Sequence, residues 1–120
     1  MNVWPNFRLT PQLVAQAYSD TGLRPIARSF LVRGRGGACG ACAITAVYCY
    51  ANGITAPLTR EQADDVRVEA VNKREAGGGY LCGVMLGYDG RSRLEDGPVA
   101  LGLEDGHEIR AALDPKDVQP

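Results

Sequence analysis

Apolar positions recur at helical spacing along much of this chain. The first such run predicts a helix over 10–21, which begins at a threonine cap followed by proline and ends at Gly22. A second helix is predicted over 41–51, where apolar residues lie on every side, so this helix belongs in a core. Thr59 and Gln62 form a capping box that starts a third helix with one polar face.

The segments between and after these helices give weaker signals. The stretch 23–32 is predicted to be extended with one short strand, and 33–37 is predicted to be a glycine-rich loop. Periodicity alone does not decide the last third of the chain. There, 80–88 and 99–113 fit either strands, the second of them folded as a hairpin, or helices that carry glycines on one packing face.

Composition indicates one ordinary globular domain. The chain has 120 residues, of which 45% are hydrophobic and 22% charged, enough to bury a core without disulfides or metal. We expect an N-terminal arm over 1–9 and one globular domain over 10–120. The predicted class is α-rich α+β, with four to five helices and one or two short strands. Neither a signal peptide nor a membrane span is visible, which predicts a cytoplasmic protein without a membrane partner.

Charge is distributed unevenly although the net charge is only −1. Residues 1–53 carry +4, whereas residues 54–120 carry −5. Two arginines, Arg33 and Arg35, stand in the glycine-rich loop ahead of the apolar helix, whose N-terminus favours anions. They are candidates for binding a small anionic ligand or a protein. Nucleic acid is not predicted as a partner, because no recognisable module is present and aromatic residues do not alternate with the arginines.

Four cysteines and a single histidine supply the remaining candidate chemistry. Cys42 is placed in the first turn of the apolar helix, where a thiolate is favoured. A cysteine nucleophile also needs a base, and His107 is the only imidazole, so these two are the catalytic candidates. Cys39 and Cys42 additionally have the spacing of a redox dithiol.

The same cysteines allow a metal hypothesis. A structural zinc site at Cys39 and Cys42 would need Cys82 and His107 to complete four ligands. Cys49 cannot join Cys42 at one zinc, because two helical turns separate them by about 10 Å. Simple burial explains Cys49 and Cys82, since free cysteine packs as a small hydrophobe. No cofactor is predicted, and zinc is kept as the alternative.

Three segments resemble a loose group of short uncharacterised bacterial proteins. They are the cysteine pair before an apolar helix, Gly87-Tyr88-Asp89-Gly90, and the segment Ala17-Tyr18-x-x-Thr21-Gly22-Leu23-Arg24-Pro25. This resemblance implies helices over 80–88 and 99–113 and implies no activity. Residues 42–62 also resemble the opening of the NlpC/P60 cysteine peptidases, through Cys42, Tyr48, Tyr50, Gly53, Pro57, Thr59 and Gln62. The second resemblance implies that Cys42 is a nucleophile.

Together these observations favour a small protein that acts as a non-catalytic binding or regulatory module. The first alternative is a cysteine-dependent enzyme, a thiol hydrolase or thiol redox protein, that uses Cys42. The second alternative is a structural metal site at Cys39 and Cys42.

Overall fold

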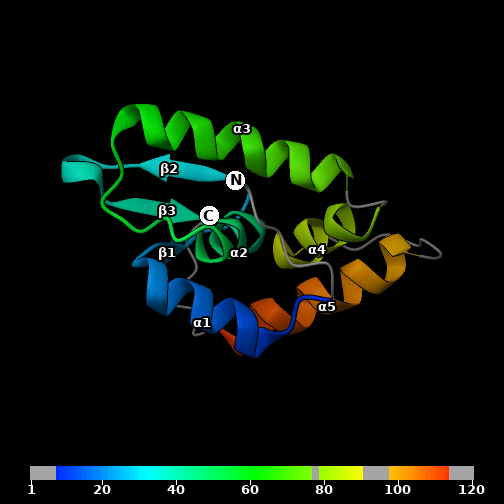
Figure 1. Ribbon diagram of the computed structural model, residues 1–120. Helices are drawn as coiled ribbons and strands as arrows, with labels where there is room; N and C mark the ends of the chain where they lie inside the picture. Colours follow the sequence, from blue (N-terminus) through cyan, green and yellow to red (C-terminus); the bar gives the residue numbers. More distant parts are fainter. Residues whose placement is uncertain (1–7, 77–78, 91–97, 114–120) are drawn as a thin grey trace.

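The computed structural model describes residues 8–76, 79–90 and 98–113 of the chain, and Figure 1 shows how its elements are arranged. In chain order, these elements are α1 (Pro11–Thr21), β1 (Arg24–Pro25), β2 (Leu31–Arg33), the short 3-10 helix η1 (Arg35–Gly37), β3 (Cys39–Ala41), α2 (Ala43–Ala51), α3 (Arg60–Ala76), α4 (Tyr80–Tyr88) and α5 (Pro98–Ala112). The predicted α-rich α+β class is confirmed.

Local sequence signals set the limits of the early helices. The Thr10 side chain caps α1 by accepting a hydrogen bond from the Leu13 N–H at 3.2 Å, and Gly22 ends the helix with a φ of 72°. At the start of α3, the Gln62 N–H donates to Thr59 Oγ1 at 3.1 Å, and the Thr59 N–H donates to Gln62 Oε1 at 2.9 Å. Both predicted caps are confirmed.

A small sheet precedes the central helix. Its strand order is β1-β3-β2, with β1 parallel and β2 antiparallel to β3. The third strand goes beyond the one or two that were predicted, because β3 has only three residues and shows no readable alternation. Gly40 in β3 is required by packing: a Cβ there would lie 2.6 Å from Ile26 Cγ2.

The apolar helix α2 lies in the core, as predicted. Every residue from Ala43 to Cys49 is buried. Figure 1 shows α3 running along β2 on one side of the molecule and α1 lying on the opposite side, with α4 and α5 beside them. Among the described residues, no helix is both long enough and apolar enough to cross a membrane.

The last third of the chain is helical, and the hairpin alternative for 99–113 is wrong. Helices α4 and α5 meet through glycines on both partners, Gly83 and Gly87 on one and Gly102 and Gly106 on the other. A Cβ on Gly102 would lie 2.0 Å from the Tyr80 carbonyl oxygen, so the two backbones are in direct contact. Glycine weakens each isolated helix, but here it permits a packing that a larger residue would block.

Candidate functional site

The first candidate is the cysteine corner, where β3 leads into α2. Cys42 is the N-cap residue of α2, and its N–H donates to the Phe30 carbonyl at 3.2 Å. Its Sγ lies 3.3 Å from Thr45 Oγ1, and the residue is 1% exposed. Burial raises the pKa of the Cys42 thiol, although hydrogen bonds from Thr45 oppose this effect. The lowered pKa expected at a helix N-terminus is therefore not found.

The neighbouring thiols have the same character. Cys39 is buried in β3 and donates to the Gly37 carbonyl at 3.3 Å, and burial raises its pKa despite the nearby charge of Arg33. Burial also raises the pKa of Cys49 to about 12. Thiolates are the reactive form of cysteine, and burial favours the protonated thiol at all three positions.

The proposed partners of these cysteines lie elsewhere. His107 is an exposed residue of α5, and Cys82 is a half-buried residue of α4. Thr45, not an imidazole, contacts the Cys42 thiol. Within residues 8–76, 79–90 and 98–113, no group of three or more histidine, cysteine or acidic side chains is arranged to hold a metal ion. The nucleophile, redox and zinc hypotheses stay predictions.

A buried tyrosine pair explains why this corner is so well packed. Tyr18 donates to the Ala41 carbonyl at 2.7 Å, and its hydroxyl oxygen lies 3.0 Å from that of Tyr88. Arg110 in turn donates to the Tyr88 carbonyl at 2.8 Å. The segments that carry Tyr18, the cysteine pair and Tyr88 therefore converge in the core. All three segments contribute residues to one hydrophobic core.

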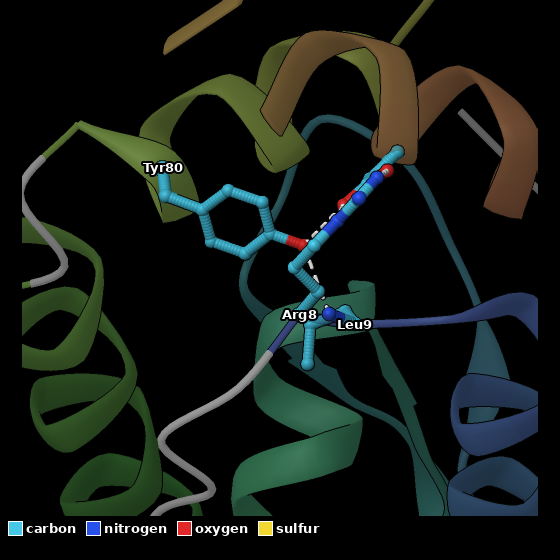
Figure 2. A network of polar contacts seen from close by, with 4 residues as sticks. Arg8, Leu9 and Tyr80 are labelled. Carbon is cyan, nitrogen blue, oxygen red and sulfur yellow. Dashed lines mark hydrogen bonds and ion pairs between the residues drawn. The ribbon is translucent and has the colours of Figure 1, made fainter. Parts of the chain in front are cut away.

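A second polar cluster, which sequence reasoning missed, ties the start of the described chain to α5. Arg8 binds the Asp105 carboxylate through two nitrogens, at 2.5 and 3.0 Å, and Tyr80 donates to the same carboxylate at 2.6 Å. Figure 2 shows the Tyr80 hydroxyl also accepting from the Leu9 N–H, at 2.8 Å. Arg8 and Leu9 end the predicted arm over 1–9, and both are bonded to the domain.

This cluster keeps a buried carboxylate charged. Asp105 is 3% exposed. Burial acts to raise the pKa of Asp105, but the hydrogen bonds from Arg8 and Tyr80 and the charge of Arg8 outweigh it, and the pKa is lowered. Burial and the hydrogen bond to Asp105 raise the pKa of Tyr80 to about 12. The Asp105 carboxylate and the Tyr80 hydroxyl are both hydrogen-bonded within the cluster, which indicates a structural role.

The exposed candidate is a groove between α3 and β2, which we call the arginine groove. Its volume is about 600 Å³, and its walls consist of Leu31, Val32, Arg33, Arg60, Ala63, Asp64 and Arg67. Three guanidinium groups and one carboxylate thus line a single hollow. This balance gives the groove a positive field, and guanidinium forks match the geometry of carboxylate and phosphate.

Main-chain carbonyls orient two of these arginines. Arg33 Nε donates to the Leu58 carbonyl at 2.9 Å, and an Arg67 terminal nitrogen donates to the Leu31 carbonyl at 3.2 Å. Leu58 is held in turn by the glycine-rich loop, because its N–H donates to the Gly37 carbonyl at 2.9 Å. A Cβ on Gly37 would lie 2.5 Å from the Leu58 oxygen, so this close approach needs glycine.

The third arginine is uncommitted. The Arg60 side chain lines the groove and makes no hydrogen bond or ion pair with any residue that the structure describes. Arg67 shares its charge with Asp64 through a 3.0 Å ion pair on the exposed side of α3. A ligand entering the groove would therefore meet one free guanidinium and two that are already oriented.

Only one of the two arginines predicted to bind an anion lies in the groove. Arg33 lines the arginine groove, whereas Arg35 in η1 does not, and the N-terminus of α2 is not among the groove walls. Sequence reasoning missed Arg60 and Arg67. A signal was present, because residues seven apart on a helix lie almost on the same side.

A second groove lies on the opposite flank of α3, between this helix and α2. Its volume is about 430 Å³, and its lining is Tyr48, Ile54, Gln62, Asp65, Val66, Val68 and Glu69. Two carboxylates replace the arginines here. Burial, followed by the charge of Glu69, raises the pKa of Tyr48. Helix α3 therefore separates a basic hollow from an acidic one.

Comparison of the chain with protein-family models, with curated proteins and with solved structures finds no match. The resemblances noted in the sequence stay predictions, and a functional proposal has to stand on the geometry of the described residues.

Proposed function

We propose that this protein is a non-catalytic binding module that holds an anionic ligand in the arginine groove. The observation that carries the proposal is the convergence of Arg33, Arg60 and Arg67, from a strand and a helix, on one open hollow. Guanidinium has five N–H donors, so the single carbonyl bonds of Arg33 and Arg67 leave donors for a ligand. Orienting these two side chains in advance also reduces the entropy lost on binding.

The cysteine-dependent alternative has weaker support. A thiol catalyst needs an accessible thiolate, whereas Cys39 and Cys42 are each 2% exposed or less and their pKa values are raised by burial. The groove, by contrast, is open to solvent, and four of its seven lining residues carry charge.

Anion titrations monitored by amide chemical shifts test the proposal. We expect phosphate, sulfate or a dicarboxylate to shift the amide signals of β2 and the first half of α3. Arg60→Gln should weaken binding about tenfold or more, because one hydrogen bond to a charged group contributes about 1.5–3 kcal/mol and 1.4 kcal/mol is tenfold in affinity.

Arg24→Gln is the matched control, since it removes the same charge from the exposed end of β1 outside the groove. Its affinity for the anion should stay near that of the wild type. Equal weakening by both variants would show only a general effect of net charge. Shifts spread over the whole surface, or none at all, would overturn the proposal.

A further inference from the structure

We propose, building on the anion-binding function above, that the ligand of the arginine groove is a small phosphate monoester in its dianionic form, with its organic group against Val32. Four features of the groove lead to this assignment: its charge balance, the arrangement of its donors, the competing carboxylate of Asp64, and its exposed apolar wall.

The charge balance favours a dianion. Three arginines and one aspartate line the groove, which leaves a local charge of +2. A phosphate monoester carries about −1.5 to −2 charges at pH 7, because its second pKa lies near 6. A carboxylate or a sulfate monoester carries only one negative charge and would leave the groove half neutralised.

The donors come from two walls of the groove. Arg33 projects from β2 and is fixed to the Leu58 carbonyl, whereas Arg67 projects from α3 and is fixed to the Leu31 carbonyl. Guanidinium groups fixed on two different walls can each offer a fork to a group that has three acceptor oxygens. Arg60, which has no partner among the described residues, supplies the third contact.

Asp64 pairs with one of these donors. Its carboxylate accepts from the same Arg67 guanidinium at 3.0 Å, and its side chain is 63% exposed. An incoming phosphate competes with this exposed carboxylate, and a surface ion pair of this kind contributes little to stability. Removing the Asp64 charge should therefore strengthen phosphate binding without loosening the fold.

The size and apolar wall of the groove indicate an ester and not inorganic phosphate. Its volume of about 600 Å³ falls within the range of about 300–1,000 Å³ typical of small-molecule sites. Val32 lines the groove and is 52% exposed, so it offers an apolar surface to a ligand there. The organic part of the ester would cover it.

Calorimetric titration with phenyl phosphate, phenyl sulfate and benzoate tests the assignment, because these probes share one apolar group. At pH 7.5 phenyl phosphate should bind at least about tenfold more tightly than the two monoanions, as the extra charge strengthens each hydrogen bond. At pH 5 the advantage should shrink to within about threefold, since the ester takes up its second proton near pH 6. Inorganic phosphate should bind more weakly than phenyl phosphate.

Two variants sharpen the result. Asp64→Asn should raise the affinity for phenyl phosphate severalfold and keep the same pH profile, which assigns the profile to the ligand and not to Asp64. Arg60→Gln should lower the affinity, whereas Arg24→Gln should leave it unchanged. A phosphoserine peptide should bind no more tightly than phenyl phosphate, and a much tighter peptide complex would overturn the small-ligand assignment.

The two levels of proposal fail differently. If none of the anions binds, the binding function itself is wrong. If the three phenyl probes bind equally with a flat pH profile, anion binding stands and the phosphate monoester assignment falls.

Discussion

The contact between α4 and α5 and the arginine groove represent opposite uses of side chains. In the helix pair, Gly83, Gly87, Gly102 and Gly106 remove side chains so that the two backbones touch. In the groove, Arg33 and Arg67 extend long side chains across a hollow and fix them to carbonyl oxygens. The helix pair has no room for an added methyl group, whereas the groove has room for a ligand.

This difference separates the residues that maintain the fold from those available for function. Close packing makes interior positions intolerant of added volume, so variants in the helix pair should change stability. Arg60 in the groove is exposed, and exposed charges contribute little to stability, so a variant there should change binding with little effect on the fold. Each experiment below tests one side of that division, beginning with the largest expected effect.

Gly102→Ala should be the most damaging single methyl addition. The new Cβ would lie 2.0 Å from the Tyr80 oxygen and 2.8 Å from the Val84 nitrogen, so α4 and α5 would have to separate. We expect a loss of about 3 kcal/mol in the free energy of unfolding, the upper part of the range for overpacking. Urea denaturation measures it.

The sign of that result is decisive, because alanine in an exposed helix would instead stabilise by about 1 kcal/mol relative to glycine. Arg60→Gln is the contrast from the groove and should lie within about 0.5 kcal/mol of the wild type. If Gly102→Ala were neutral or stabilising, the tight contact between the two helices would be refuted.

Asp105→Asn should give the next largest effect. The buried carboxylate accepts from Arg8 and Tyr80, and each hydrogen bond to a charged group contributes about 1.5–3 kcal/mol. We expect the variant to lose about 2 kcal/mol in urea denaturation near pH 7. Asp64→Asn is a matched control, because its carboxylate is 63% exposed. Equal losses in the two variants would contradict a stabilising role for the hydrogen bonds of Asp105 with Arg8 and Tyr80.

The same carboxylate predicts an acid dependence. The folded-state pKa of Asp105 is depressed below its ordinary value of 3.8, so its contribution is fully present above that pH and disappears as the pH falls through the folded value. The stability gap between wild type and Asp105→Asn should therefore narrow between neutral pH and pH 3. A gap of constant size over that range would mean that the carboxylate is not held in its charged form.

The fold was largely predictable because its signals are local. Caps at Thr10 and Thr59 and the uniform apolarity of 41–51 each specify a helix without reference to the rest of the chain. Periodicity could not decide 99–113, because Gly102 is unfavourable in an isolated helix and becomes favourable only when α4 supplies the contact. The strand β3 could not be predicted either, because its three residues show no alternation and it forms only by pairing with β1 and β2.

The candidate site was less predictable, because it depends on exposure and on contacts between distant segments. Residue type and spacing made Cys42 a candidate, but sequence alone does not report that this thiol is buried. Conversely, Arg33 lines the same groove as Arg60 and Arg67 only because α3 lies along β2 in the folded chain. The spacing of seven residues could have predicted that Arg60 and Arg67 lie on the same side of α3. It could not have predicted that β2 lies opposite them.

The smallest expected effect on stability, and the sharpest test of the cysteine corner, comes from thiol labelling. Cys82 is the half-buried thiol on α4, whereas Cys39, Cys42 and Cys49 are buried. Iodoacetamide on the native protein at pH 7.5 should therefore modify Cys82 first, and Cys82→Ser should abolish the fast phase while shifting stability by less than about 0.5 kcal/mol. Cys42→Ser serves as the control and should leave the fast phase intact.

Rapid loss of the Cys42 thiol would show that this corner opens to solvent and would restore the nucleophile hypothesis. Slow modification, at the rate of global unfolding, would place Cys42 with the close-packed region and leave the arginine groove as the exposed candidate site.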